Sequence, residues 1–361
     1  IFDGEPARET VEALKKALSE CGARVFITPG NHDFCAPGSV WLEENWPENV
    51  YVFTGVLEAV TIPDLNCRVY GAGYQSMDSA PLLESRDYTL EPGETIPALR
   101  LAPASGEPFA RREYTVTAAP GSRVTIFEHC TAEQPFLTRL RLSAGENADI
   151  RLVQLLEPQK GSILRHEVTG DCAQGGHISL VSILLGDGDV YCDSQIDLRG
   201  RGASFDADYG YLGQNSRRVD INLNVLHRAA DTRCGITAGG ALMDRSEKVF
   251  RGTIDFQNGC SGSVGSELET VLLLGEDVVN KTVPVILCAE EQVEGTHGAT
   301  IGQLDDETLF YFESRGIPRT QAEQLLARAS IERLARLSED EDFSRAVLEL
   351  LDARLQKEEE H

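Results

Sequence analysis

Residues 294–318 read EGTHGATIGQLDDETLFYFESRGIP, and this stretch decides how the rest of the chain is interpreted. Before it, apolar and polar residues alternate in short segments; after it, apolar residues recur about every 3.6 positions, which is the helical period. Asp305 and Asp306 are acidic, as the first turn of a helix favours, while Gly316 and Pro318 end that helix. The sequence therefore predicts a β region followed by a helical region.

The β region runs from Tyr88 to about Val293 and consists of short strands separated by turn residues. Strict alternation is clearest in the segment Arg218–His227. Comparable strands recur about every 20 to 30 residues, which suits the turns of a β-solenoid. The same periodicity also fits a sandwich or a barrel, so it does not choose among these architectures.

A solenoid would leave unpaired backbone at its last turn, where strands from a partner can add. The apolar segments Val271–Leu274 and Val283–Leu287 lie near the end of the β region. We therefore expect this end of the solenoid to be a pairing surface.

The helical region carries two S/T-x-x-E patterns, at Thr320 with Glu323 and at Ser338 with Glu341. Each pattern is the signature of a capping box, in which the two side chains satisfy backbone N–H groups at a helix start. Apolar stripes follow both patterns. The sequence thus predicts three helices after residue 305, two of them opened by capping boxes.

The runs HGATIGQLD, at His297–Asp305, and LFYFESRGI, at Leu309–Ile317, closely resemble the C-terminal signature of the SufB/SufD family, especially its SufD branch. The resemblance extends less sharply from about Ser85 to the C-terminus. It implies a mainly β fold: a right-handed parallel β-helix with a C-terminal α-helical domain. It also implies a non-enzymatic scaffold subunit of the SUF iron–sulfur cluster assembly complex. Such a subunit pairs with a SufB-like solenoid, or with itself, and docks a SufC-like ATPase.

The resemblance places His297 near the interface between two solenoids and implicates it in cluster formation. An imidazole can ligate iron or transfer protons near neutral pH. Some SufD members have a cysteine two residues earlier, where this chain has Gly295, so a thiolate ligand is missing. The alternative is a core or interface histidine bonded to backbone. We expect no stably bound cofactor, a transient cluster at most, and three further candidates at this interface: Glu294, Thr296 and Cys288.

The end of the first predicted helix is rich in aromatic residues, and the resemblance makes the helical region the docking site of the ATPase. The candidate docking residues are Phe310, Phe312, Arg315 and Ile317. The alternative is that they pack against the last turn of the solenoid. The sequence has no G-x-x-x-x-G-K-[ST] motif, so any ATP chemistry must come from a partner.

Residues 1–84 have a different character, with an amphipathic helix at Thr10–Leu18 and a strand at Arg24–Thr28. The strand leads into Gly-Asn-His-Asp, which resembles a metal-binding motif of calcineurin-like metallophosphoesterases. The resemblance makes Asn31, His32 and Asp3 vestigial candidates for a metal site. The remaining ligands of that family are absent, so we expect no catalytic metal pair. The alternative is that these residues merely form the turn after the strand.

We therefore expect three parts: a small α/β fragment at 1–84, a β-helix core at 85–304 and a helical domain at 305–361. The first two are unrelated pieces, joined either as a genuine fusion or by an error of gene assembly. Two alternative functions remain open. One is a metallophosphoesterase or nuclease-related protein, and the other is a glycan-binding β-solenoid, against which the aromatic content of 7% counts.

The amino-acid composition argues against some classes of partner and against a membrane location. The chain has 33 basic and 58 acidic residues, a net charge of −25, which repels phosphate backbones and disfavours nucleic acid. No apolar run approaches ~20 residues, so no membrane span is predicted. Nine cysteines occur without any Cys-x-x-Cys, which indicates reduced thiols in a cytoplasmic protein. Cys192, Cys234 and Cys260 are expected in the core as small hydrophobes rather than as a sulfur relay.

Overall fold

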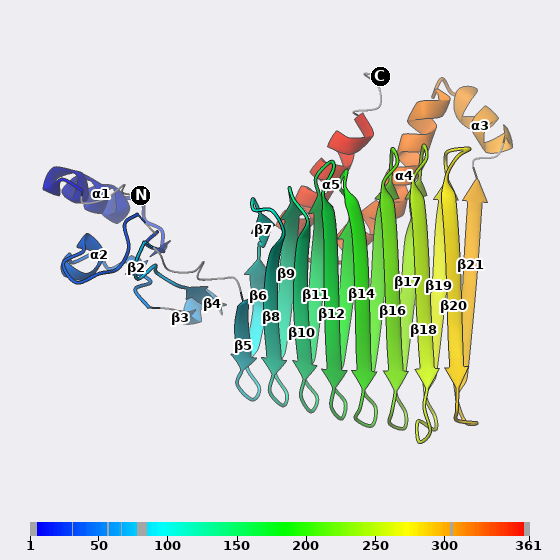
Figure 1. The fold of residues 1–361 in the computed structure, drawn as a ribbon, viewed down its shortest axis with the longest axis horizontal. Coiled ribbons are helices and arrows are strands. Elements are labelled where there is room, and N and C mark those ends of the chain that lie inside the picture. Colours follow the sequence, from blue (N-terminus) through cyan, green and yellow to red (C-terminus); the bar gives the residue numbers. More distant parts are fainter. Residues whose placement is uncertain are drawn as a thin grey trace. The chain divides into compact units, whose positions relative to one another are not determined.

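The fold of the chain was analysed in a computed structural model (Figure 1). The structure describes residues 6–30, 32–55, 58–65, 67–77, 85–303 and 306–356. The chain divides into two compact units, Ile1–Arg86 and Asp87–His361. Each unit is treated separately below.

The first unit combines short helices with two small sheets. One sheet pairs β1 with β2 in parallel, and the other pairs β3 with β4 antiparallel. A small core forms around Ile27, Cys35 and Trp41. Gly22, at a φ of 65°, follows the first helix and allows the chain to turn there. The elements are α1 (Arg8–Glu20), β1 (Val25–Ile27), α2 (Val40–Glu43), β2 (Val50–Val52), β3 (Glu58–Ile62), the 3₁₀ turn η1 (Pro63–Leu65) and β4 (Cys67–Gly71).

The second unit is a β-solenoid built from two sheets. One sheet has the order β20-β18-β16-β14-β12-β10-β8-β5, and the other has the order β21-β19-β17-β15-β13-β11-β9-β6, with β7 beside β9. The strands are β5 (Ser85–Leu90), β6 (Thr95–Leu101), β7 (Ala104–Ser105), β8 (Ala110–Ala118), β9 (Arg123–Ala132), β10 (Phe136–Ala144), β11 (Asp149–Pro158), β12 (Ile163–Cys172), β13 (His177–Leu184), β14 (Asp189–Leu198), β15 (Ser204–Gly213), β16 (Arg218–His227), β17 (Arg233–Leu242), β18 (Glu247–Phe256), β19 (Val264–Leu273), β20 (Val279–Cys288) and β21 (Glu294–Gln303).

The connectivity identifies the architecture, because successive strands of the chain alternate between the two sheets. Neighbours within each sheet are parallel, as in the pairs β16–β18 and β17–β19. A sandwich of antiparallel sheets is therefore excluded, and the predicted parallel β-helix is confirmed. In Figure 1 the strands stand side by side in a single row of turns, each beside the next.

Residues in the left-handed backbone region recur at one set of tight turns. They are Gly93, Gly121, Asn147, Gly175, Gly202, Asp231 and Gly262. The spacing between consecutive members ranges from 26 residues (121 to 147) to 31 residues (231 to 262). Glycine, asparagine and aspartate tolerate this conformation best. The N–H of each donates to a carbonyl in the corresponding turn of the next coil, for example Gly202 N to Ala230 O at 3.1 Å. The turn chemistry thus fixes the length of each coil.

Alternate residues of each strand point into the space between the two sheets. The largest side chains in this interior are fully buried and mostly aromatic: Phe205, Tyr209, Tyr211, Phe250 and Phe256. Burial of a side chain of this size contributes about 1.5–3 kcal/mol. Because each coil places its apolar residues above those of the coil before it, the core is continuous along the solenoid.

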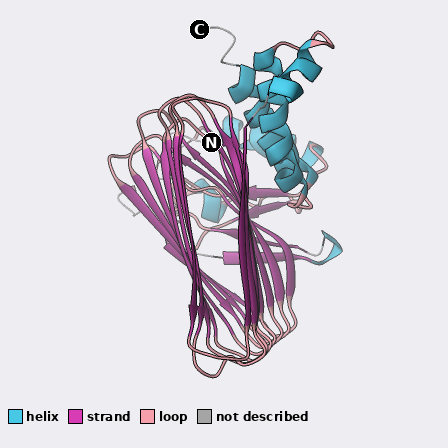
Figure 2. Ribbon diagram, turned by 90° about the vertical axis from the view of Figure 1, so that its right-hand side faces the viewer, coloured by secondary structure: helices cyan, strands magenta, loops and turns pink. Residues whose placement is uncertain are grey.

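Three helices follow the last strand: α3 (Asp306–Glu313), α4 (Arg319–Arg336) and α5 (Glu341–Gln356). Helices α4 and α5 run along the outer face of one sheet (Figure 2), where α4 contacts β13, β15 and β17. Ile331 and Val347 belong to a second buried core on this face, together with Val181 of the sheet. A Cβ atom at Gly210 would lie 2.5 Å from Leu334 Cδ1, so glycine at this position lets α4 approach the sheet closely.

The predicted capping boxes are wrong, although both helices exist. Helix α4 begins at Arg319 after Pro318 and has no side-chain cap, so Thr320 lies inside its first turn. Helix α5 is capped by Asp340, whose Oδ1 accepts a hydrogen bond from Phe343 N at 2.8 Å. Asp340 is the better cap because its carboxylate also interacts favourably with the helix dipole.

We predict that the outer-face core holds the helical region on the solenoid. Ile331→Ala should lower the unfolding free energy by about 2–5 kcal/mol, because it leaves a cavity at a fully buried position. Leu325→Ala is the matched control on the same helix, since Leu325 is 45% exposed, and it should change stability by less than ~0.5 kcal/mol. Urea unfolding followed by circular dichroism measures both. Equal effects of the two substitutions would contradict the assigned packing.

Candidate functional site at the open end of the solenoid

The solenoid ends in an unpaired edge. Strands β20 and β21 are the last members of their sheets and have neighbours on one side only, β18 and β19 respectively. In Figure 1 these two strands close the row of turns at the yellow and gold end. Exposed apolar side chains accompany the edge, at Val279, Val283, Leu287 and Ile301. Unpaired backbone groups beside apolar side chains favour the addition of strands from another chain.

The alternation of apolar and polar residues ended at about Val293, and the structure has one further strand, β21, inside the expected β-helix core at 85–304. Its sequence has no apolar alternation, because glycine, alanine and threonine fill most of it. The strand forms through backbone pairing with β19 along its whole length, from Val264 beside Glu294 to Leu273 beside Gln303. Val283–Leu287 lies in the terminal strand β20 as expected, whereas Val271–Leu273 lies one turn further in, on β19.

All four candidate interface residues lie on the terminal turn. His297 is exposed in the middle of β21 and pairs in register with Glu267 of β19. Glu294 and Thr296 are exposed on the same strand, in the opposite phase of the pleat. Cys288 ends β20 and is exposed, and its thiol donates to the Glu290 carbonyl at 3.0 Å. Among the described residues, none of these four side chains hydrogen-bonds another.

A buried ion pair lies in the interior, one turn below the open end. The ammonium group of Lys248 on β18 donates to a carboxylate oxygen of Glu269 on β19. Thr282 and the Tyr211 hydroxyl also donate to that carboxylate, Tyr211 at 3.2 Å. Lys248 and Glu269 are both fully buried. Burial lowers the pKa of Lys248, and the attraction of Glu269 opposes this shift.

Glu267 is a second buried carboxylate beside this ion pair, and it is only 4% exposed. Its Oε2 atom is buried without a hydrogen-bond partner. A Cβ atom at Gly252 would lie 2.2 Å from Oε2, so this glycine on the facing strand β18 provides the space that the carboxylate occupies. Burial and the neighbouring charge of Glu269 raise the pKa of Glu267 to about 7. The sequence analysis did not identify this residue.

A model of the family "SUF system FeS cluster assembly, SufBD core domain" matches residues 103–330. The chain belongs to the SufBD family. It is 27% identical over 143 residues to the iron–sulfur cluster assembly protein SufD of Bacillus subtilis, covering 40% of this chain and 33% of the relative. It is 23% identical over 250 residues to SufD of Escherichia coli, covering 68% of this chain and 59% of the relative.

A SufBD family protein of Pyrococcus horikoshii, PH1385, is 26% identical over 227 residues, which cover 60% of this chain and 50% of the relative. The chain therefore spans between a third and three-fifths of the length of these three SufBD relatives. The expected membership of the SufB/SufD family is confirmed. No helix in the described part of the chain is long and apolar enough to cross a membrane.

The residues expected to dock an ATPase lie on and just after α3 of this SufBD chain. Phe310 is 71% exposed and Arg315 is exposed, while Phe312 and Ile317 are half-buried. The Arg315 guanidinium lies 3.6 Å from the centre of the Tyr311 ring. Helix α3 thus presents an aromatic and cationic surface to solvent. Its role in docking stays a prediction.

The solenoid cysteines are buried, with the exception of Cys288. Cys192, Cys234 and Cys260 are enclosed in the core. Burial raises the pKa of the Cys234 thiol to about 12, so it stays protonated at neutral pH. Such thiols are poor nucleophiles and weak metal ligands, which agrees with their expected role as small core residues.

His227 lies beside Cys234 in this interior and is fully buried. Its ring nitrogens are within hydrogen-bonding distance of Thr232 Oγ1, at 2.7 Å, and of Cys234 Sγ, at 3.3 Å. Burial lowers the pKa of His227 to about 4. The imidazole is therefore neutral at physiological pH.

Only part of the metallophosphoesterase-like motif lies within the described residues of the first unit. Asn31 and Asp3 lie outside the described residues. His32 is exposed after β1, and Asp33 Oδ1 accepts a hydrogen bond from Gly30 N at 2.8 Å, as in a turn. Throughout the described residues, no group of three or more histidine, cysteine, aspartate or glutamate side chains could hold a metal ion.

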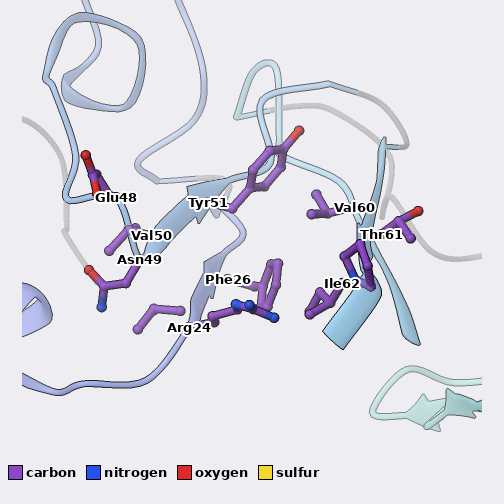
Figure 3. A pocket seen from close by; sticks show the side chains of 11 residues that line it. Arg24, Phe26, Glu48, Asn49, Val50, Tyr51, Val60, Thr61 and Ile62 are labelled. Carbon is purple, nitrogen blue, oxygen red and sulfur yellow. The ribbon is translucent and has the colours of Figure 1, made fainter. Parts of the chain in front are cut away.

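A hollow of the first unit lies between β1, β2 and β3 and has a volume of about 480 Å³ (Figure 3). It is lined by apolar side chains with Arg24, Glu48 and Asn49 at its border, and His32 is not among its residues. Its lining includes the hydroxyl-bearing residues Tyr51 and Thr61 but no histidine.

We predict that Lys248 neutralises a charge that the fold cannot otherwise tolerate. Lys248→Met should lower the unfolding free energy by about 3–5 kcal/mol, because it leaves Glu269 buried and uncompensated. Adding Glu269→Gln should recover most of that loss. Lys281→Met is the control, since its side chain is 58% exposed and its pair with Glu247 is worth less than ~1 kcal/mol. Urea unfolding measures the unfolding free energy of all three variants. If the double variant does not recover stability relative to Lys248→Met, this explanation is contradicted.

His227 should make the solenoid sensitive to acid. Its folded pKa of about 4 lies below the unfolded value of 6.5, so only the unfolded chain takes up a proton between these values. The contribution of His227 to the unfolding free energy is complete above pH 6.5 and is lost as the pH falls toward 4. Between pH 7 and pH 5 the unfolding free energy should fall by about 2 kcal/mol from this residue. His227→Gln should remove this part of the pH dependence. The control His129→Gln, at a 44% exposed side chain, should retain it, and equal slopes in both variants would refute the assignment.

Proposed function

We propose that this chain is a scaffold subunit for iron–sulfur cluster assembly, which pairs with a SufB-like solenoid through β20 and β21 and docks a SufC-like ATPase on its helical region. The observation that carries the proposal is the open parallel edge, which bears His297 in a chain of the SufBD family. The relatives named above are iron–sulfur cluster assembly proteins, which supports the same role here.

The chemistry of the edge favours a second solenoid over an unrelated ligand. The outer edges of β20 and β21 have no neighbouring strand, and another solenoid end offers backbone groups that can pair with them. The apolar groups Val283 and Ile301 would be removed from water by such pairing. Two solenoids joined in this way would form one continuous pair of sheets.

The terminal turn also bears groups that suit a transient cluster. His297 offers an imidazole and Cys288 an exposed thiol, which are the side chains that bind iron in such clusters. Neither contacts the other in this chain, so a cluster would need ligands from the partner. We propose that any cluster is held between subunits and is not resident in the isolated chain.

The helical region supports the second part of the proposal. Phe310 and Tyr311 are exposed on α3, and Arg315 just after α3 stacks on Tyr311; α3 contacts α4, and α4 and α5 are anchored to the solenoid by the outer-face core. An aromatic surface on a firmly held helix is typical of helix docking sites. Because the sequence has no P-loop, the ATPase activity belongs to the partner.

We predict a ternary complex when the chain is co-expressed with a SufB-like subunit and a SufC-like ATPase. The double variant Val283→Lys/Ile301→Lys should lose the SufB-like subunit but keep the ATPase, because two charges would be buried at the pairing edge. Phe310→Asp should have the opposite effect. Affinity purification with quantitative gel analysis measures both partners.

Phe109→Asp is the matched control, because Phe109 is 69% exposed and precedes β8, far from the terminal turn in the row of coils. It should keep both partners. Retention of the SufB-like subunit by the double lysine variant would refute the pairing surface. Association of the chain only with itself would refute the assignment of a SufB-like partner.

A further inference from the structure

Two carboxylates, Glu267 and Glu269, face the interior from β19, one coil below the open end of the solenoid. Lys248 of β18 donates to Glu269, and so do Thr282 of β20 and the hydroxyl of Tyr211 on β15. None of these three donors hydrogen-bonds Glu267. Glu269 is therefore satisfied as an anion, whereas Glu267 receives no share of its donors.

Glu267 lies against Gly252 of the facing strand β18. A Cβ atom at Gly252 would lie 2.2 Å from Oε2 and 2.7 Å from Oε1, so the glycine makes the space that the carboxyl group fills. Oε2 is buried there and has no hydrogen-bond partner. An unpaired carboxylate anion is costly to remove from water, and such a group normally shifts its pKa and becomes neutral. The geometry therefore favours the protonated acid.

The remaining groups that face Glu267 offer it no ion pair. β17 places Ile236 beside it and contributes the Cys234 thiol, which burial keeps protonated. β21 places His297 in register with it, and the lack of a partner at Oε2 means that no hydrogen bond joins this oxygen to the imidazole. The neighbouring charge on its own strand is the anion Glu269. Burial, followed by the charge of Glu269, raises the pKa of Glu267 to about 7.

We propose that Glu267 is a proton-operated switch of the terminal coils: the neutral acid stabilises the β19–β21 end of the solenoid, and loss of its proton weakens that end and its pairing with a second solenoid. β19 holds β21 by backbone pairing along its whole length, so a charge that disfavours the inward position of Glu267 acts directly on the terminal strand. The effect on pairing rests on the proposed function; the effect on the isolated chain does not.

The pH effect of Glu267 has the opposite direction to that of His227. In the unfolded chain its pKa returns to the ordinary value of 4.5, so between pH 4.5 and about 7 only the folded chain holds the proton. The contribution of Glu267 to folding is complete below pH 4.5 and is lost as the pH rises through 7. A partner that covers the open end removes further water and raises the pKa again, so pairing takes up a proton and weakens as the pH rises.

Hydrogen exchange followed by mass spectrometry, at pH 6 and pH 8 with correction for the intrinsic exchange rate, measures the opening of β19–β21 in the isolated full chain. Between these pH values the opening constant should rise about tenfold more in the wild type than in Glu267→Gln, which corresponds to about 1.4 kcal/mol. The glutamine keeps the shape of the side chain and carries no charge. All other titrating groups are common to the two chains and cancel in the comparison.

Glu294→Gln is the matched control, because Glu294 is an exposed acid on the terminal strand β21. It should keep the wild-type response to pH, and the distant strands β9 and β11 should respond alike in all three chains. The same response in the wild type and in Glu267→Gln would overturn the switch. An equal loss of the response in Glu294→Gln would also overturn it, because general repulsion among surface acids would then be the cause.

The affinity for the SufB-like subunit is measured separately, by biolayer interferometry at pH 6 and pH 8. It should fall severalfold at pH 8 for the wild type and stay constant for Glu267→Gln. If exchange depends on Glu267 but the subunit binds at neither pH, the proposed function fails and the switch stands. If the subunit binds and exchange does not depend on Glu267, the switch fails and the scaffold function stands. Affinity independent of pH in a chain whose exchange depends on Glu267 would overturn the link to pairing.

Discussion

Parallel backbone pairing between successive coils is the interaction on which the rest of the structure depends. Each coil of the solenoid is stabilised by its two neighbours, and the turn residues with positive φ keep every coil close to the same length. The terminal coil has only one neighbour, so the architecture necessarily leaves an unpaired edge at β20 and β21. The fold therefore determines where a partner can join, and the helices cover the outer face of a sheet while leaving this edge free.

Two buried carboxylates in the solenoid interior, Glu128 and Glu267, differ in their hydrogen bonding. Glu128, on β9 beside the first strand of its sheet, is fully buried and well satisfied: Gln154 Nε2 lies 2.6 Å and His166 Nε2 lies 2.8 Å from its Oε2. Glu267, one turn below the open end, has no partner at Oε2. Both strands have a neighbour on each side, so the difference comes from the polar side chains that the adjacent coils supply.

Alternation and turn residues predicted individual strands well, as in Arg218–His227, which is β16 with the same bounds. They left solenoid, sandwich and barrel open, and the resemblance to the SufB/SufD family favoured the solenoid. The expected core at 85–304 includes β21, but no strand was predicted there, because its small residues carry no periodic signal and the strand forms through pairing with β19. The sequence analysis missed Glu267 for a related reason. Alternation in Glu267-Leu268-Glu269 suggests that Leu268 is the buried residue, yet Leu268 is 51% exposed and both acids face inward. Pairing with the preceding coil sets the register, and composition does not show it.

The last strands of the solenoid bury polar residues and expose apolar ones, which is the reverse of the usual pattern. On β19 and β20 the inward phase becomes polar, with Glu267, Glu269 and Thr282, while the outward apolar residues Leu268 and Val283 are exposed. An isolated solenoid gains nothing from this arrangement, since it buries charge and exposes apolar surface at the same place. The arrangement is favourable if a second protein covers the apolar groups. The exposed apolar residues of β19 and β20 therefore favour this end of the solenoid as the surface on which a second protein assembles.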